Sequence, residues 1–180
     1  MKKLILILLC VPLIGLGQNR YHIDEVTSPN DTLTYLKHDM SLLNGIIYRS
    51  YENGQLQSEV NYKDGEREGL SKSWYENGQL EIEYTYIDGK IEGLNKIWNE
   101  NGQLVKEDNF KDGKREGLSK SWYENGQLKS VVNYIEGDRD GLLKIWHSNG
   151  QLKYVINCKD DKFISKKCWD EDGNEIDDKK

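Results

Sequence analysis

Glu68–Leu80 reads EGLSKSWYENGQL, and the same string returns unchanged at Glu116–Leu128. A weaker copy, EGLNKIWNENGQL, lies midway between them at Glu92–Leu104. The spacing is therefore 24 residues, and an Asn-Gly pair recurs with that period at Asn53-Gly54, Asn77-Gly78, Asn101-Gly102, Asn125-Gly126 and Asn149-Gly150. A short fixed period is typical of repeat proteins, in which each copy is one supersecondary unit.

A second turn signal has the same period. It occupies Asp64-Gly65, Asp88-Gly89, Asp112-Gly113 and Glu136-Gly137, followed by Asp160-Asp161. Asn-Gly and Asp-Gly are the dipeptides that tolerate two successive positive φ angles, which a two-residue hairpin turn requires. Both signals are therefore predicted to be tight hairpin turns of this kind.

The stretches between the turns alternate polar and apolar residues, as half-buried strands do. The apolar side chains of Leu80–Tyr86, for example, alternate with acidic and hydroxyl ones. Side chains predicted to share a face are Leu70, Lys72 and Trp74 in one strand of a unit, and Leu56, Val60 and Tyr62 in the other. No segment beyond residue 17 shows a sustained 3.6-residue period, so essentially no helix is expected.

The sequence thus predicts an all-β fold, an elongated twisted antiparallel sheet of stacked 24-residue β-hairpin repeats. One hairpin cannot bury its apolar face alone, but stacked hairpins can, with Leu expected against Leu and Trp against Trp across neighbouring strands. The regular repeats span residues 45–176. Residues 18–44 are expected to be a degenerate capping unit with a strand at Thr32–Lys37, and residues 177–180 a frayed tail.

Residues 1–17 have the pattern of a secretory signal peptide. Lys2 and Lys3 form a positive start, and the apolar run Leu4–Leu16 follows. Small residues at Gly15–Gly17 precede a cleavage point at Gln18. The run is too short to cross a bilayer comfortably, which takes about 20 residues. The chain is therefore expected to be exported and to have no integral membrane span.

The charge balance disfavours nucleic-acid partners. The chain has 25 basic and 31 acidic residues, for a net charge of −6, and loss of Lys2 and Lys3 with the leader would make it −8. Phosphate contacts need clustered Lys and Arg, and the sequence has no such block.

Two cysteines remain beyond the leader, Cys158 and Cys168. Outside the cytoplasm they could form a disulfide that closes a short loop. Alternatively they are small apolar fillers, because Cys158 occupies the position of Tyr62, Tyr86, Phe110 and Tyr134 in the other repeats.

Familiar catalytic patterns do not occur. His22, His38 and His147 are scattered, and the sequence has no HExxH, CxxC, P-loop or GxSxG. Acidic residues such as Glu76, Glu100 and Glu124 recur once per repeat, which is typical of a solvated ladder, whereas a catalytic carboxylate pair needs unlike environments. The chain is therefore predicted to be no enzyme, with no cofactor and no metal.

One column of side chains is a candidate binding face. It combines lysine and tryptophan at the repeat period, at Lys72, Trp74, Lys96, Trp98, Lys120, Trp122, Lys144 and Trp146. Such a row could hold a glycan or the edge strand of a partner protein. Alternatively the lysine stems cover the tryptophan rings, and their ammonium groups pair with a glutamate ladder. Asp108 stands at a position that is otherwise apolar, and marks either a local weakness or a binding notch.

The recurring Tyr-Glu-Asn-Gly-Gln-Leu, Tyr-Lys-Asp-Gly and Trp-Tyr segments, as at Trp74–Leu80 and Tyr62–Gly65, resemble the MORN repeat. They are most similar to the bacterial variant found in the YwqK family of antitoxins, and the resemblance covers about residues 41–176. It implies an elongated hairpin array used for binding, a candidate antitoxin role, and no catalytic residues. An immunity protein outside the cytoplasm would combine this role with an export signal.

These observations lead to one expected function and one alternative. The first is a non-catalytic, exported repeat protein that binds another protein, as an antitoxin or immunity protein neutralising a toxin. The alternative is a glycan-binding or surface-adhesion module of the cell envelope. In either case the expected location is the periplasm, the outer cell envelope or the exterior of a bacterium.

Overall fold

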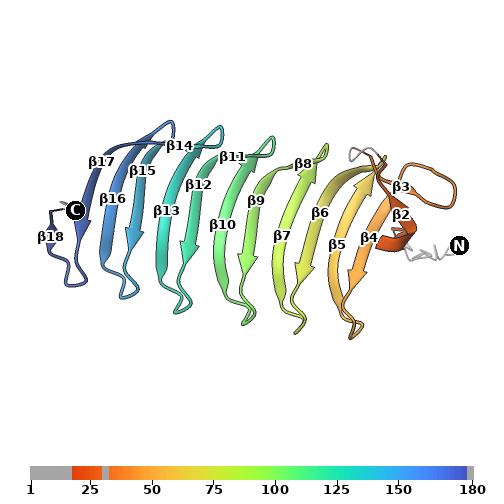
Figure 1. Ribbon diagram of the computed structural model, residues 1–180, viewed down its shortest axis with the longest axis horizontal. Helices are drawn as coiled ribbons and strands as arrows, with labels where there is room; N and C mark the ends of the chain where they lie inside the picture. Colours follow the sequence, from red (N-terminus) through yellow and green to blue (C-terminus); the bar gives the residue numbers. More distant parts are fainter. Residues whose placement is uncertain (1–17, 30–32, 178–180) are drawn as a thin grey trace, which may run out of the picture.

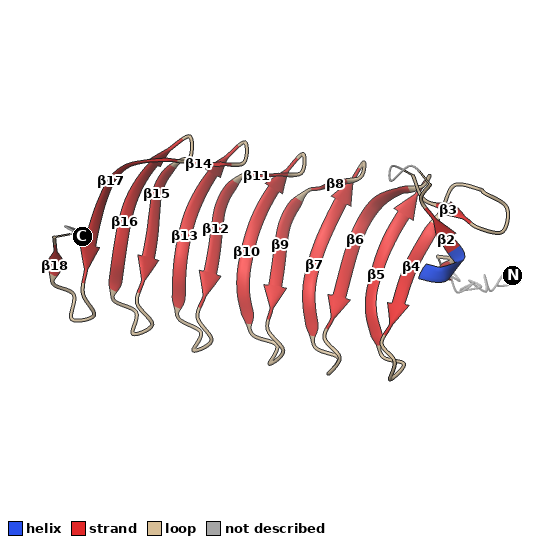
Figure 2. Ribbon diagram, in the orientation of Figure 1, coloured by secondary structure: helices blue, strands red, loops and turns tan. Residues whose placement is uncertain are grey.

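The computed structural model describes residues 18–29 and 33–177, and the predicted signal peptide at 1–17 lies outside them. The described chain forms one long sheet of hairpins laid side by side, with β1 at one end of the sheet and β18 at the other (Figure 1). Sixteen of the described strands belong to this sheet, and β2 and β3 form a separate two-stranded sheet. The predicted fold class is confirmed; the described residues contain only one short 3-10 turn, η1 (Ile23–Glu25) (Figure 2).

From β4 onward, each long strand pairs with the long strands before and after it in the chain. The strands that lead into the Asn-Gly turns are β4 (Gly45–Ser50), β6 (Glu66–Trp74), β9 (Gly93–Trp98), β12 (Gly117–Trp122) and β15 (Gly141–Trp146). The strands that follow those turns are β5 (Leu56–Lys63), β7 (Leu80–Ile87), β10 (Leu104–Lys111), β13 (Leu128–Ile135) and β16 (Leu152–Lys159). The last hairpin consists of β17 (Lys162–Trp169) and β18 (Glu175–Ile176), joined at Asp172-Gly173. The short strands β8 (Lys90–Ile91), β11 (Lys114–Arg115) and β14 (Asp138–Arg139) complete the hairpins around the Asp-Gly turns.

The Asp-Gly turns have the predicted conformation. Asp64 and Gly65 have φ angles of 49° and 81°, and the next three turns repeat the pattern. Each turn is also bonded to the preceding repeat, since the Gly89 N–H donates to the Arg67 carbonyl at 3.0 Å. In addition, the Glu68 carboxylate accepts from the Asp88 N–H at 2.9 Å. These bonds hold successive repeats in register along one edge of the sheet.

The Asn-Gly turns differ from the prediction, because only their glycine has a positive φ angle. The Tyr75 N–H donates to the Gln79 carbonyl and the Gly78 N–H donates to the Tyr75 carbonyl, both at 2.9 Å. This pattern defines a three-residue loop in which a right-handed turn is followed by one left-handed residue. The Asn77 carboxamide oxygen accepts from the Gln79 N–H at 2.9 Å and holds the loop closed.

A β-bulge beside each Asn-Gly turn changes which side chains share a face. Ser73 pairs with Ile82, but Trp74 pairs with Leu80, so Glu81 has no partner in the ladder. Residues directly opposite each other lie on the same face, and the extra residue therefore moves Leu80 to the tryptophan side. For this reason Leu56 does not share the face of Val60 and Tyr62, which otherwise have the predicted common phase. Trp also pairs with Leu rather than with Trp.

The residues with the lowest exposure share one side of the sheet, here called the buried face. Its central row consists of the pairs Ile47–Val60, Ser71–Tyr84, Asn95–Asp108, Ser119–Val132 and Leu143–Ile156. Small or branched residues in this row are covered by the longer side chains around them. One apolar cluster contains Val132, Leu143, Ile156 and Cys158, whereas the middle of the row is polar.

Asp108 lies in that polar stretch and is only 3% exposed. Its carboxylate accepts from the Ser119 hydroxyl at 2.5 Å and lies 2.7 Å from the Lys106 ammonium group. A buried carboxylate with these partners is satisfied within the fold. Asp108 is therefore a paired structural residue, and it offers no open notch.

Residues 18–44 cover the first edge of the array, although not as another hairpin. β1 (Arg20–His22) pairs with β4 in parallel, and β2 (Val26–Thr27) pairs with β3 (Tyr35–Leu36) beside it. A parallel pair needs a long crossover, which the segment between β1 and β4 supplies. The second apolar cluster, Val26, Leu36, Leu43 and Ile47, lies beneath this segment.

The two cysteines are buried and free. Tyr154 pairs with Cys168, while Cys158 pairs with Phe163, so the register separates the cysteines by four residues along β16. That is about 13 Å at the rise of a strand, whereas a disulfide needs Cα atoms within about 7 Å. The predicted alternative of a disulfide is therefore incompatible with this sheet, and the cysteines act as apolar fillers.

A row of hydroxyl groups ties successive repeats together at the Asn-Gly edge. The Tyr51, Tyr75 and Tyr123 hydroxyls donate to the carbonyl oxygens of Trp74, Trp98 and Trp146 at 2.7–2.8 Å. In the last repeat His147 Nε2 lies 2.9 Å from the Trp169 carbonyl oxygen. Burial raises the pKa of Tyr75 above its usual value, which is consistent with a protonated hydroxyl that donates this bond.

Tyr75→Phe should lower the free energy of unfolding by about 0.5–1.5 kcal/mol, because the Trp98 carbonyl loses its donor while the ring remains. Urea denaturation followed by circular dichroism would measure the change. An unchanged midpoint would show that water replaces the hydroxyl without loss, and that the row contributes nothing to stability.

Candidate binding face

The structure places the predicted lysines and tryptophans on one side of the sheet, opposite the buried face. This side, which carries Lys72, Lys96, Lys120 and Lys144, is called the lysine face below. Alternation along each strand puts Trp74, Trp98, Trp122 and Trp146 on it as well. All eight predicted residues therefore line the same surface, with lysines two strands, or about 10 Å, apart.

Sequence reasoning missed the acidic half of this surface. Glu59, Glu83 and Glu107 lie directly opposite the lysines, so that the row begins Glu59, Lys72, Glu83, Lys96, Glu107, Lys120. The Lys72 ammonium group is 3.1 Å from the Glu83 carboxylate. The predicted ladder of Glu76, Glu100 and Glu124 lies instead in the Asn-Gly turns, exposed to solvent. The 24-residue spacing of Glu59, Glu83 and Glu107 was visible in the sequence, but their pairing depended on the register.

The alternation of charge ends in the C-terminal half of the row. There Lys120, Lys144 and Lys167 alternate with Val131 and Val155, which occupy the glutamate positions. Lys72, Lys96 and Lys120 are half-buried, but Lys144, which has valine on both sides, is exposed. Lys144 therefore carries a positive charge that no carboxylate of the row compensates, whereas the Lys167 ammonium group is 3.1 Å from the Glu175 carboxylate.

The tryptophan rings are half-buried and pack in the sheet beside leucine. The pairs are Trp74–Leu80, Trp98–Leu104, Trp122–Leu128 and Trp146–Leu152. Cation–π contacts within residues 18–29 and 33–177 involve tyrosine and phenylalanine rings, as with Arg67 over Tyr86 and Arg115 over Tyr134, and no tryptophan. The tryptophans thus support the sheet, rather than serving as platforms for the lysines.

A second feature that the sequence did not predict is a row of exposed leucines on the lysine face. Leu70, Leu94, Leu118 and Leu142 have 41%, 42%, 47% and 52% of their surface accessible. They precede the lysines by two residues in each repeat, so the two rows run side by side. Apolar side chains in such a row, next to charged ones, are typical of an interaction surface.

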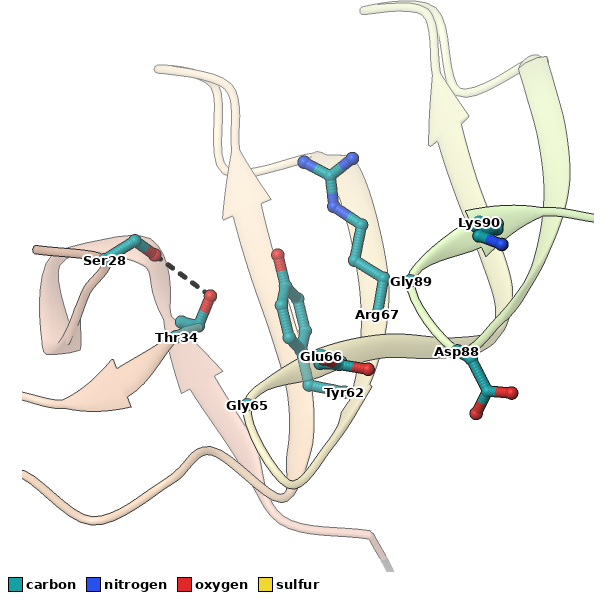
Figure 3. Close-up of a pocket in the computed structure, with 9 residues that line it drawn as sticks. All are labelled: Ser28, Thr34, Tyr62, Gly65, Glu66, Arg67, Asp88, Gly89 and Lys90. Carbon is teal, nitrogen blue, oxygen red and sulfur yellow. Dashed lines mark hydrogen bonds between the residues drawn. The ribbon is translucent and has the colours of Figure 1, made fainter. Parts of the chain in front are cut away.

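A hollow lies elsewhere, between the N-terminal cap and the first Asp-Gly turns (Figure 3). It has a volume of about 440 Å³, and Ser28, Thr34, Tyr62 and Arg67 line it. The Ser28 and Thr34 hydroxyls bond to each other at 3.0 Å. An interaction with the Tyr62 hydroxyl raises the pKa of Arg67 above its usual value, and a guanidinium is charged at neutral pH in any case. This hollow offers no nucleophile beside a general base.

Other chemistry has no assembled site in the described part of the chain. No three His, Cys, Asp or Glu side chains converge there as metal ligands. Nor does that part of the chain contain a helix long and apolar enough to span a membrane. What the arrangement provides is a long surface of alternating charge and exposed apolar side chains.

Comparisons with known proteins identify the repeat. A family model described as MORN repeat variant matches residues 43–64, 67–88, 91–112, 115–136 and 139–160. A search of curated proteins finds no match. A solved structure titled "Crystal structure of GtfA/B complex bound to UDP and GlcNAc" is similar at a TM-score of 0.25 and 9% identity, over 78% of this chain and 27% of that one. At that TM-score the likeness carries no argument about fold or function.

Proposed function

This chain belongs to the MORN repeat variant family, and from that premise we propose that it is a non-catalytic array that binds a protein partner along its lysine face. The observation that carries the proposal is the row Leu70, Leu94, Leu118 and Leu142, exposed at the same position of four successive repeats. Each exposed leucine that a partner covers is removed from water, which is the main favourable term in protein association.

The leucine row favours a protein over the alternative of a glycan. A sugar polymer is bound through hydrogen bonds and through stacking on open aromatic faces. Here the tryptophans are half-buried beside leucine, and the exposed apolar residues between the lysines and the Asp-Gly turns are leucines. Aliphatic side chains match the apolar side chains of another protein.

The more specific role we propose is that of an antitoxin or immunity protein acting outside the cytoplasm. The resemblance to the YwqK family supports the neutralising role, and the signal-peptide pattern of residues 1–17 supports export. A single-layer array suits this task, because it can cover a wide surface of a toxin without an active site of its own.

The binding role can be tested by capture of the partner from an envelope extract of the native host. The doubly substituted Leu94→Ser, Leu118→Ser protein should lose a partner that the unsubstituted protein retains. Because both leucines are exposed, the expected effect of the substitutions on stability is small. A matched control is Ile87→Ser with Ile135→Ser, which removes equally exposed apolar side chains beside the Asp-Gly turns. Equal capture by both variants would contradict the assignment of the lysine face.

The proposed export can be tested separately from binding. The protein recovered from its native host should have the mass of the chain without residues 1–17 and should fractionate outside the cytoplasm. Fractionation combined with intact-mass spectrometry measures both properties. A full-length protein in the cytoplasm would contradict export, and would leave a cytoplasmic toxin as the partner to seek.

A further inference from the structure

The charge pattern of the lysine face suggests where the partner docks and what chemistry it has. We propose that an acidic segment of the partner, with apolar side chains between its acidic ones, lies across the C-terminal half of this face. The segment is centred on Lys144, with Lys120 and Lys167 on either side. This inference rests on the proposed function and deepens it. It assigns the contact to one half of an array whose repeats are otherwise nearly alike in sequence.

The first support is the loss of charge compensation along the row. Lys72 lies between Glu59 and Glu83, and the Arg20 guanidinium also pairs with Glu59. Lys144, in contrast, lies between Val131 and Val155 and is exposed. Each lysine of the N-terminal half has a glutamate on both sides, whereas the C-terminal half has valine between its lysines. Carboxylates lie only at the two ends of that half, where Glu107 is opposite Lys120 and Glu175 is 3.1 Å from the Lys167 ammonium group.

Net charge makes this contrast more significant. The whole chain carries −6, so an acidic partner is repelled by the average surface and attracted by this half of one face. Electrostatic complementarity of this kind selects the docking position and orientation more than it adds affinity.

The second support is the apolar surface that lies beside these lysines. Leu118 and Leu142 are the most exposed members of the leucine row, at 47% and 52%. Val131 and Val155 add half-buried apolar area between the lysines, where the other repeats have carboxylates. This half therefore combines the positive charge with the larger apolar area.

The spacing defines the segment further. Lysines on every second strand are about 10 Å apart, and an extended chain advances about 3.3 Å per residue. A segment that crosses the strands at right angles would thus place every third residue over a lysine. The chemistry that fits is an extended segment with Asp or Glu at every third position and an apolar residue between.

The experiment uses fluorescein-labelled peptides of repeated Glu-Leu-Ser and of repeated Lys-Leu-Ser, titrated with the full-length mature protein by fluorescence anisotropy. The Glu-Leu-Ser peptide should bind, with an affinity that falls as salt is raised, and the Lys-Leu-Ser peptide should not. Lys120→Gln with Lys144→Gln should weaken binding at least about tenfold, the loss expected when two charge contacts are removed. The matched pair Lys72→Gln with Lys96→Gln should leave it within about twofold, because those lysines are already compensated.

A reversed variant keeps the test independent of folding defects. Lys120→Glu with Lys144→Glu should reject the Glu-Leu-Ser peptide and gain binding of the Lys-Leu-Ser peptide. Equal weakening by the two glutamine pairs, or equal binding of both peptides to the unsubstituted protein, would overturn the inference. So would an oligothymidine that displaces the Glu-Leu-Ser peptide more strongly than unlabelled peptide does, since the surface would then favour nucleic acid.

The same variants separate this inference from the proposed function. A captured partner that is lost with Leu94→Ser, Leu118→Ser but retained with Lys120→Gln, Lys144→Gln would support the binding role and overturn the acidic docking site. If the partner is retained by both variants, the lysine face itself is the wrong surface.

Discussion

Leu43→Ala should lower the free energy of unfolding by about 2–5 kcal/mol, the largest stability effect expected in this protein. Leu43 is 0% exposed and packs with Val26, Leu36 and Ile47 between the cap and the first strand of the array. Its N–H also donates to the Thr34 carbonyl, so the surrounding backbone is held in place and cannot close over a cavity. Chemical denaturation monitored by circular dichroism and tryptophan fluorescence would measure the loss.

The control is Leu142→Ala, which shortens the same side chain at a position where 52% of it is exposed. That change should stay within about 0.5 kcal/mol. If the two variants are equally stable, the cap adds nothing to the stability of the repeats and residues 18–44 are only an appendage. A loss confined to the N-terminal repeats is the expected pattern in amide exchange, because contacts in a repeat array pass only between neighbours.

Gly126→Val should destabilise the protein by about 1–3 kcal/mol, through strain in the backbone rather than loss of contacts. Gly126 has a φ angle of +84° in an Asn-Gly turn, and a β-branched residue rarely adopts that region. The glycine N–H donates to the Tyr123 carbonyl at 2.9 Å, and this bond fixes the conformation that valine disfavours. Thermal unfolding of the variant is the measurement.

Gly126→Asn is the matched control, because asparagine tolerates a left-handed conformation better than other non-glycine residues. It should lose less stability than the valine variant. An asparagine variant as unstable as the valine variant would indicate that the side chain, and not the φ angle, is responsible. The loss of stability would then be attributed to crowding against the Gln103 amide, which is 3.2 Å from an added Cβ.

The repeat architecture could be predicted from the sequence because it depends on local chemistry. Asp64-Gly65 and its equivalents favour positive φ at both positions whatever surrounds them, and a period-two pattern between such turns leaves a hairpin as the simplest structure. The 24-residue period then requires that equivalent units stack. The candidate lysines and tryptophans followed from the same alternation, which is also a local property.

The register and its consequences could not be predicted in this way. The one-residue bulge beside Trp74 is compatible with the alternation of either strand and appears only when the two strands pair. It moves the leucines to the tryptophan side and lengthens the Asn-Gly turns. Likewise, the parallel pairing of β1 with β4 follows from contacts between segments distant in the chain.

By itself, therefore, the sequence determined the period, the turns, the strands and the all-β class, since each depends on residues within one unit. Only the tertiary structure decided which residues of neighbouring units face each other. The cross-strand register pairs Lys72 with Glu83, places Lys144 between two valines, and keeps Cys158 apart from Cys168. The physical reason is that a strand's pattern specifies which side chains alternate, while the cross-strand register specifies their partners, and the binding properties of the surface depend on the partners.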